Sequence, residues 1–382
     1  MDILSTLLSP FSFVATYFLP FIFVLIIVVF VHELGHFLVA RWCDVEIESF
    51  SIGFGSEIVG WTDRHGTRWK IAWIPLGGYV KFLGDDNVAS AGVSQAELSR
   101  LPAETRARTF QAKSVWQRSL IAAAGPLANF LLSIVIFATL FATIGRTTSE
   151  ARIDAIVAGS PAEAAGFRIG DVVISVDGRD VSTFGEMQRL IATSNGRELE
   201  IVVRRGGLPQ SLRAAAREQE NVDRSGRKHR SFVLGLRTQP AAESIQVERS
   251  DPLTALWLGA RETWFVIDRT FSYIGDLFAG YASTQDLGGP IRIAEASGEA
   301  ATVSFAALIS LTAVLSVSIG LLNLFPIPML DGGHLVFYGI EAILGRPLSE
   351  RAQEIGLRIG FALVLMLMVM ATWNDLARLW SS

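Results

Sequence analysis

Long uncharged stretches constrain the fold of this chain more than any other feature of its sequence. Residues 14–31 are 18 residues without a charge, and at 1.5 Å rise per residue a helix of this length covers about 27 Å, nearly one hydrocarbon core. We expect this first span to continue to about Ala40. Three further uncharged stretches predict a four-span protein; they run from Ser119 to Gly145, from about Val303 to Phe325 and from about Ile359 to Trp373.

Composition supports a membrane protein and excludes other classes. Apolar residues make up 50% of the chain and the mean hydropathy is +0.40, too high for a purely soluble enzyme. The 33 basic and 37 acidic residues give a net charge of −4, so nucleic acid is not an expected partner. Because Cys43 is the only cysteine, a metal has to be held by His and carboxylates. No Lys or Arg precedes Arg41, so we expect no cleaved signal peptide.

The segments between the spans have other patterns. The runs 69–74 and 79–82 flank the turn-prone Pro75-Leu76-Gly77-Gly78 and predict a β-hairpin. A polar segment from Glu150 to about Gln239 contains two strand-like runs, 171–176 and 199–204, and predicts a soluble α/β domain of about 90 residues. From Pro252 to Ala282 the pattern predicts an amphipathic helix, which packs either on the membrane and the spans or on the soluble domain.

Basic residues in the short loops predict the orientation of the chain. They place these loops in the cytoplasm, with the N-terminus and the soluble domain outside. The basic residues are Arg41, Lys113, Arg118, Arg346, Arg351 and Arg358.

The first span ends with the motif His32-Glu33-Leu34-Gly35-His36. On a helix, residues i and i+4 share a face, so both imidazoles can bind one zinc ion while Glu33 acts as general base toward the water that the zinc activates. Ionisable groups among apolar neighbours are costly in lipid unless they are paired or bind a metal. The alternative is that the two His residues only cap a helix at the headgroups.

A second cluster follows the third span, at residues 323–334. Its Pro and Gly residues must break the helix, and irregular backbone at membrane depth is tolerated only where it is buried in protein or lines a cavity. Since spans one and three run in the same direction, both clusters lie at the same depth. Asp331 is the expected third ligand, with His334 as a rival; Asp331 could instead be the N-cap of the next helix.

The paired motifs, HExxH and NxxPxPxxDGG around an inserted domain, resemble the site-2 protease family, most closely the bacterial regulator-of-sigma-E proteases of the inner membrane. The resemblance implies that His32, His36 and Asp331 bind Zn²⁺, that Glu33 activates water, and that Asn323 holds substrate or the oxyanion. The segment 125–129 is similar to the family's GPxxN motif. We interpret Gly125 and Pro126 as packing residues, whereas Asn129 can reach the site.

Two less specific similarities to the family concern substrate binding. The hairpin around residues 77–81 is similar to the family's membrane-reentrant β element, whose edge can pair with an unwound substrate, or it serves only as scaffold. The inserted domain, from Ser160-Pro161 through Val176-Asp177-Gly178, resembles one PDZ domain, which either captures peptide ends or excludes bulky substrates.

These features predict a polytopic α-helical membrane protein with four transmembrane helices, a membrane-associated β-hairpin and one inserted PDZ-like α/β domain. The expected parts are 1–40 (first helix, HExxH), 41–115 (cytoplasmic loop with the hairpin), 116–146 (second helix), 147–240 (periplasmic PDZ domain), 241–302 (amphipathic linker), 303–345 (third helix) and 346–382 (fourth helix).

The expected function is zinc-dependent intramembrane proteolysis in the bacterial inner membrane, with the active site near the cytoplasmic side. The family resemblance implies that the substrates are single-pass transmembrane proteins, such as anti-sigma factors already trimmed outside, or signal-peptide remnants. A membrane-anchored PDZ adaptor with a decayed metal site and a surface-acting zinc protease are the rival functions. The resemblance names no individual substrate.

Overall fold

The computed structural model describes residues 14–84, 102–148, 151–181, 183–194, 196–222, 228–238, 246–278 and 288–381. The chain forms two compact units. Residues 1–141 and 251–382 form one, called here the helical body; residues 142–250 form the other, called here the insert.

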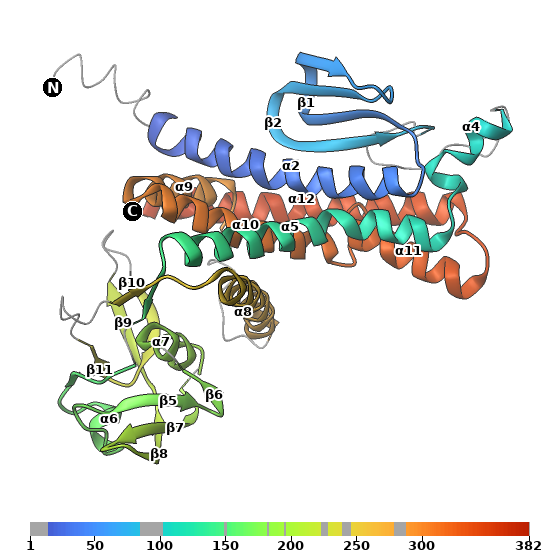
Figure 1. Cartoon of the computed structure of the whole chain (residues 1–382). Coiled ribbons are helices and arrows are strands. Elements are labelled where there is room, and N and C mark those ends of the chain that lie inside the picture. The colour runs from blue at the N-terminus through green and yellow to red at the C-terminus, as the bar shows by residue number, and fades with distance from the viewer. Residues whose placement is uncertain are drawn as a thin grey trace, which may run out of the picture. The chain divides into compact units, whose positions relative to one another are not determined.

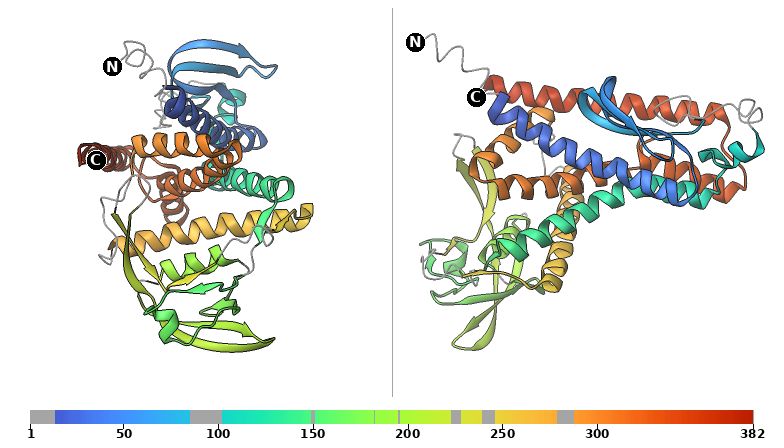
Figure 2. Two further views of the ribbon diagram at one scale, coloured as in Figure 1. Left: turned by 90° about the vertical axis from the view of Figure 1, so that its left-hand side faces the viewer. Right: turned by 45° about the horizontal axis from the view of Figure 1, so that its top comes forward.

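Long apolar helices run side by side in the helical body (Figures 1 and 2). Four of the described helical segments are long and apolar enough to cross a membrane, in agreement with the four expected spans. They are Val14–Trp42, which joins η1 (Val14–Phe18) to α2 (Leu19–Trp42), then α5 (Val115–Thr143), α10 (Phe305–Leu324), and Arg351–Trp380 within α12 (Glu350–Ser381). The other helical segments of the body are α4 (Ala103–Ala107), η2 (Phe110–Ala112), α8 (Pro252–Phe278), α9 (Pro290–Val303) and α11 (Asp331–Leu344).

Small residues bring these helices together. A Cβ atom added to Gly35 of α2 would lie 2.4 Å from the carbonyl oxygen of Ala124 in α5, and one added to Gly320 of α10 would lie 3.1 Å from that of Pro126. Large apolar side chains on the same helices face outward instead, as Leu38 and Leu131 do at 56% and 62% exposure. This distribution is typical of helices packed in lipid.

The sheet beside α2 differs from the expected hairpin. Strand β1 (Ile47–Thr62) pairs with β2 (Arg68–Phe82) through a turn at residues 63–67, while residues 75–78 lie inside β2. Residues 49–52 of β1 have partners in both 78–81 and 68–71, so β1 lies between the two runs that were expected to pair with each other. The expected turn at residues 75–78 is therefore wrong, because its Pro and Gly residues bend β2 around β1 instead.

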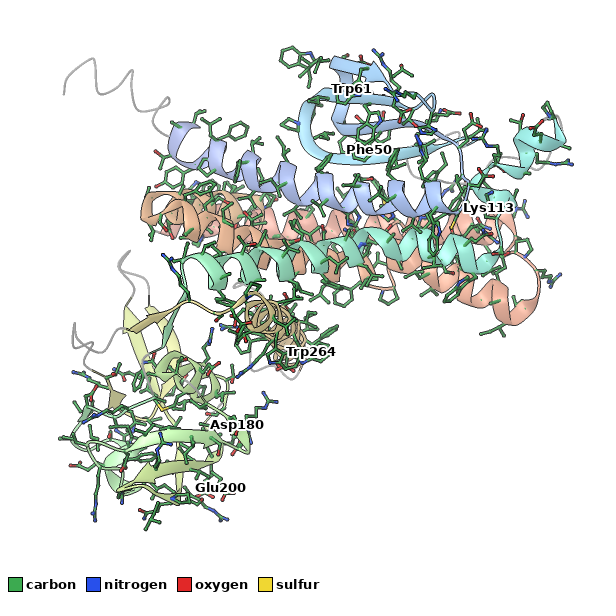
Figure 3. The ribbon with its side chains drawn as sticks, in the orientation of Figure 1. Phe50, Trp61, Lys113, Asp180, Glu200 and Trp264 are labelled. Atoms are coloured by element: carbon green, nitrogen blue, oxygen red, sulfur yellow. The ribbon has the colours of Figure 1, made fainter. Side chains whose placement is uncertain are left out.

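An aromatic cluster fixes this sheet on α2. Phe50 of β1 is 1% exposed and lies between the sheet and α2 (Figure 3). Its ring meets those of Phe30 and Phe37 of α2 edge-on, with centroids 5.8 and 5.7 Å apart. Edge-to-face aromatic pairs at this spacing stabilise the contact beyond the area they bury.

Within the expected linker of residues 241–302, α8 is the helix predicted from Pro252 to Ala282, of which residues 279–282 lie outside the described residues. Of the two alternatives for α8, the structure shows packing on the spans: Thr263 hydrogen-bonds Ser133 of α5 at 3.1 Å. An added Cβ on Gly259 would lie 2.6 Å from the carbonyl oxygen of Ile134. Trp264 faces away from α5 and is 68% exposed (Figure 3). Helix α9 was not expected; the carboxylate of Asp375 in α12 accepts hydrogen bonds from the backbone at its N-terminus.

The insert contains a four-stranded antiparallel sheet in the order β6-β5-β7-β8, with α7 beside it (Figure 1). Both strand-like runs of the sequence are present, as β5 and β7. Helix α7 starts with a capping box in which Thr183 and Glu186 each bind the other's backbone N–H. The elements of the insert are β3 (Arg146–Thr148), β4 (Ala155–Ile156), α6 (Pro161–Ala164), β5 (Val172–Val176), β6 (Arg179–Asp180), α7 (Phe184–Ala192), β7 (Glu198–Arg205), β8 (Leu208–Ala215), β9 (Arg217–Val222), β10 (Lys228–Val233), β11 (Leu236–Arg237) and β12 (Gln246–Glu248).

Candidate metal centre

His32 and His36 lie one turn apart on α2 and direct their Nε2 atoms toward each other. The two Nε2 atoms are 3.2 Å apart, and the rings meet edge-on. Both side chains are largely buried, at 11% and 12% exposure. The i and i+4 spacing of the motif thus places two potential metal-binding nitrogens at one point inside the protein.

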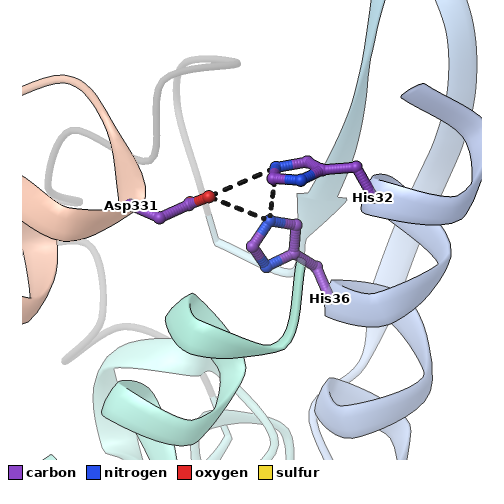
Figure 4. Close-up of side chains that lie close together, drawn as sticks. All are labelled: His32, His36 and Asp331. Atoms are coloured by element: carbon purple, nitrogen blue, oxygen red, sulfur yellow. Dashed lines mark hydrogen bonds and ion pairs between the residues drawn. The ribbon is translucent and has the colours of Figure 1, made fainter. Parts of the chain in front are cut away.

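Asp331 approaches this point from the first turn of α11, directly after the broken segment that follows α10 (Figure 4). Its Oδ2 atom lies 3.2 Å from Nε2 of His32 and 3.5 Å from Nε2 of His36. Helix α10 ends at Leu324 because Phe325, which precedes Pro326, is extended with ψ 145°. The proline that stops the helix therefore allows the chain to turn back toward the two imidazoles.

The backbone around Asp331 is held tightly. Met329, two residues earlier, has φ 101°, a region that non-glycine residues rarely adopt. Cβ atoms added to Gly332 and Gly333 would lie 2.2 and 2.3 Å from the carbonyl oxygens of Leu324 and Ile327, so only glycine fits there. The N-cap of α11 is Leu330, and Asp331 is the first helical residue. The alternative of Asp331 as an N-cap is therefore wrong, and its carboxylate faces the His pair.

The rival ligand His334 is not part of the cluster. Among the described residues, His32, His36 and Asp331 form the group whose ligand atoms all lie within 4.8 Å of one another. The imidazole of His334 instead stacks on Tyr338, with ring centroids 6.3 Å apart, and lines the neighbouring cavity.

The three residues fit a zinc ion in donor type. Two imidazole nitrogens and one carboxylate oxygen are a common donor set of catalytic zinc, which leaves a fourth position open. Oδ2 of Asp331 is buried and has no hydrogen-bond partner of suitable geometry among the described residues. A buried, unsatisfied carboxylate oxygen is costly, and a metal ion at the point shared with the two nitrogens would remove that cost.

Helix α5 forms the wall behind the two imidazoles. Nδ1 of His36 lies 2.8 Å from the carbonyl oxygen of Ile121, and the side-chain amide of Asn129 lies 3.3 Å from Nδ1 of His32. A Cβ added to Gly125 would lie 2.2 Å from Nε2 of His36. Gly125 is thus a packing residue, as expected, and it packs directly against the two imidazoles. Asn129 reaches the site, also as expected.

A cavity of about 400 Å³ opens beside the cluster. Glu33 and Asn323 both line it, together with Gly78 and Tyr79 of β2. A Cβ on Gly78 would lie 2.9 Å from Cγ of Glu33, so β2 passes directly over this carboxylate. The cavity is therefore bordered by the three-residue cluster, the carboxyl group of Glu33, the amide of Asn323 and one edge of strand β2.

A buried ion pair holds α11 against α5. Nη2 of Arg118 lies 2.6 Å from Oε1 of Glu341, and both side chains are 14% exposed. The guanidinium also lies 5.0 Å from the centre of the Tyr338 ring. The helix that begins with Asp331 is thereby tied to the helix behind the His pair.

Some of these contacts are not predictable from the sequence. Arg118 stands out only by its charge, and Glu341, with which it pairs, lies 223 residues away. The carbonyl of Ile121 carries no side-chain signal at all. Only the spacing of Gly125 and Asn129, four residues apart and so on one helix face, could have pointed to a wall built for two imidazoles.

Comparisons with known proteins place the chain in a family. The model of Peptidase family M50 matches residues 20–367. A protein of Agrobacterium fabrum, named as a candidate zinc metalloprotease, is 46% identical over 98% of this chain and 100% of its own length. Metalloprotease MmpA of Caulobacter vibrioides is 41% identical, over 94% of each chain.

A solved PDZ domain, of an SdrC-like protein from Listeria monocytogenes, is 17% identical and covers 22% of this chain and 82% of its own, with a TM-score of 0.18. That score is too low to support an argument about the insert. The family and the four long apolar helices identify a membrane protein. The match over most of the length, and relatives similar from end to end, show that this chain belongs to peptidase family M50 and is a zinc metalloprotease.

Proposed function

We propose that this protease works inside the membrane and hydrolyses peptide bonds in the transmembrane segments of single-pass proteins. The observation that carries the proposal is the depth of the cluster along an apolar helix. His36 precedes the end of α2 at Trp42 by six residues, or about 9 Å of helix rise, and His32 lies one turn deeper. A substrate able to reach this point must itself enter the apolar layer.

Each residue of the site has a role in the proposed reaction. His32, His36 and Asp331 would hold the zinc ion, which when bound would polarise the scissile carbonyl and acidify water. Glu33 takes a proton from the attacking water and passes it to the leaving amine. The side-chain amide of Asn323 donates to the carbonyl oxygen as negative charge develops on it.

Strand β2 is the proposed binding site for an unwound substrate. A helical substrate has its carbonyls occupied by backbone hydrogen bonds, so it must unwind before hydrolysis. Residues 78–82 pair with β1 on one side, and no described strand pairs with their other side, next to the cavity. An extended segment can add to this edge by β-pairing and lie over Glu33. Gly or Pro in the substrate helix makes such unwinding easier.

The first test replaces the proposed base. Glu33→Gln keeps the size of the side chain but cannot accept the proton, so cleavage of a membrane reporter should slow by at least about a hundredfold. Bound zinc, measured by elemental analysis of the purified protein, should stay at the wild-type level because Glu33 is not a ligand. Cleavage within threefold of the wild-type rate would exclude this role.

A pair of reporters tests where the enzyme cuts. They share identical loops and differ only in the transmembrane segment, which is either all leucine and alanine or carries a central Gly-Pro. We expect faster cleavage of the Gly-Pro reporter and a cut within the span, read by mass spectrometry of the fragments. A cut in the loops of both reporters at equal rate would indicate a surface-acting protease.

The insert is proposed to be a PDZ-like domain on the periplasmic side of the bacterial inner membrane. The motif around residues 160–178 and the positive-inside distribution of the loops support this placement. In this position it can bind peptide ends or exclude substrates with bulky external parts. Anti-sigma factors already trimmed outside and signal-peptide remnants are substrates of the size that such a filter would admit.

The lone cysteine allows a direct test of orientation. In a Cys43→Ser background, single cysteines replace the exposed residues Arg64, in the β1–β2 turn, and Gln210, in β8. A membrane-impermeant maleimide should label the Gln210→Cys protein in cells whose outer membrane is permeabilised, and the Arg64→Cys protein only after lysis. The reverse pattern would invert the proposed topology.

A further inference from the structure

The Nδ1 atoms of His32 and His36 both face α5. The contact of His36 shows how this helix determines which ring nitrogen carries the hydrogen. Nδ1 of His36 lies 2.8 Å from the carbonyl oxygen of Ile121. A carbonyl only accepts hydrogen bonds, so this Nδ1 carries the hydrogen. In the neutral ring, Nε2 then keeps its lone pair and directs it toward His32 and Asp331, where a metal ligand needs it.

His32 requires the same tautomer but has a different partner. Its Nε2 faces Asp331 at 3.2 Å, so to bind a metal there its Nδ1 must carry the hydrogen and find an acceptor. The group next to Nδ1 is the amide of Asn129, with Nδ2 at 3.3 Å. Asn129 is 0% exposed, and its Oδ1 has no partner among the described residues. In this orientation the amide presents a donor where the tautomer needs an acceptor.

A half-turn of the amide resolves this mismatch. Rotation exchanges the positions of Oδ1 and Nδ2, which have nearly the same shape. It would place the unpartnered Oδ1 about where Nδ2 now lies, beside Nδ1 of His32. The backbone that carries this amide is fixed by a hydrogen bond of 2.8 Å, which the hydroxyl of Ser316 in α10 donates to the backbone carbonyl of Asn129.

We infer that Asn129 is a positioning residue for zinc: its Oδ1 accepts a hydrogen bond from Nδ1–H of His32 and so fixes the tautomer and ring orientation in which Nε2 binds the metal. Outer partners of this kind typically contribute about 10–100-fold in metal affinity. The inference rests on the proposed zinc-binding role of His32 and Asp331. It assigns the Asn of the GPxxN segment to the metal site and gives it no contact with substrate.

The test compares zinc affinity, measured by competition with a chelator in detergent, for variants at this position. Asn129→Ala removes the acceptor and should weaken zinc binding by about 10–100-fold. Asn129→Asp keeps an acceptor at the same place and loses the donor, so its affinity should stay within about threefold of wild type. Ser133→Ala, one turn further along α5 and bonded to Thr263, is the matched control and should leave zinc affinity unchanged.

Cobalt supplies a readout that a merely structural role would not change. The visible spectrum of the Co²⁺-loaded protein reports ligand geometry, and it should change in Asn129→Ala but not in Ser133→Ala. Zinc affinity within threefold of wild type in Asn129→Ala would overturn the inference. A tenfold loss in Asn129→Asp would also overturn it, even if the Ala variant does not fold, since the amide would then act as a donor.

Asp331→Ala separates this inference from the proposed function. If Asp331→Ala loses zinc while Asn129→Ala keeps it, only the role of Asn129 fails. If Asp331→Ala keeps stoichiometric zinc, the proposed metal site itself is wrong.

Discussion

The helical body and the insert differ in the residues that fill their fully buried positions. In the insert the core is made of large apolar side chains such as Leu199, Ile201 and Val203, each at most 1% exposed. In the body, fully buried positions on the spans include Asn129 and Ser316, both 0% exposed, while many leucines and valines face outward.

Two solvents explain this difference. In water, burying apolar surface gives about 25 cal/mol per Å², so the insert places its largest apolar groups inside. Lipid offers no such gain between helices, and close packing of small residues and polar contacts hold the spans together instead. Close packing therefore depends on small residues in the body and on large residues in the insert. Enlarging a small buried residue should be most harmful in the body, and truncating a large buried residue should be most harmful in the insert.

The largest effect is expected where a small residue of the body is enlarged. Gly125→Leu would place a side chain where Nε2 of His36 now lies, because even the Cβ would be only 2.2 Å from that atom. One imidazole must move, so we expect zinc binding to fall by more than about a hundredfold, well beyond the loss of a single outer contact. Elemental analysis and chelator competition on the purified protein measure this.

The insert supplies a matched glycine as control. Gly185 of α7 has nothing within 4 Å of an added Cβ, so Gly185→Ala should leave zinc affinity unchanged and, by helix propensity, stabilise the insert slightly. Near-normal zinc affinity in folded Gly125→Leu would show that α5 is not the wall of the metal site.

The next effect comes from removing a large side chain in each region. Ile201→Ala empties a fully buried position and should destabilise the insert by about 2–5 kcal/mol. Leu131→Ala removes an exposed side chain of α5 and should cost less than about 1 kcal/mol. Hydrogen exchange of β7 and α5 in detergent measures both. Equal loss of protection at the two sites would contradict the contrast between the regions.

The sequence predicted the features that depend on local pattern. Uncharged length predicted the four long apolar helices, and the i, i+4 spacing predicted that His32 and His36 would share a face. The strands β5 and β7 followed from their apolar runs. The direction of the spans brought Asp331 to the level of the His pair, although from the residues alone His334 stayed open as a rival ligand.

Contacts between distant segments were not predictable in this way. The position of β1 between the two runs of β2 was not predicted. Pro75 and the following glycines indicate a bend in the chain, but they do not indicate which segment lies beside that bend. Helix α9 was missed because its N-terminus is capped by Asp375 of α12, far along the chain, and not by a local capping residue. The partners of the second imidazole nitrogens depend on how α5 packs, which no single motif encodes.

The smallest expected effect concerns the charges of the insert, where water allows a pH dependence that can be followed outside the spans. Asp171 is 1% exposed and its carboxylate accepts two hydrogen bonds of 2.7 Å from the guanidinium of Arg205, and a third from the backbone N–H of Arg168. Burial alone would raise the pKa of Asp171, but the hydrogen bonds from Arg205 and Arg168 outweigh it and hold the pKa below its usual value.

The direction of this shift fixes the direction of the pH effect. A carboxylate with a lowered pKa in the folded state contributes stability above its unfolded pKa of about 3.9, and this contribution is lost as the pH falls below that value toward the folded pKa. Hydrogen exchange of β5 and β7 should therefore be slower at pH 7 than at pH 3.5, after correction for intrinsic rates. Asp171→Asn should lower protection at pH 7 and flatten the difference. If the difference in exchange between pH 7 and pH 3.5 were unchanged in Asp171→Asn, other groups would cause it. The Asp171–Arg205 ion pair would then stabilise the insert no more than an exposed ion pair does.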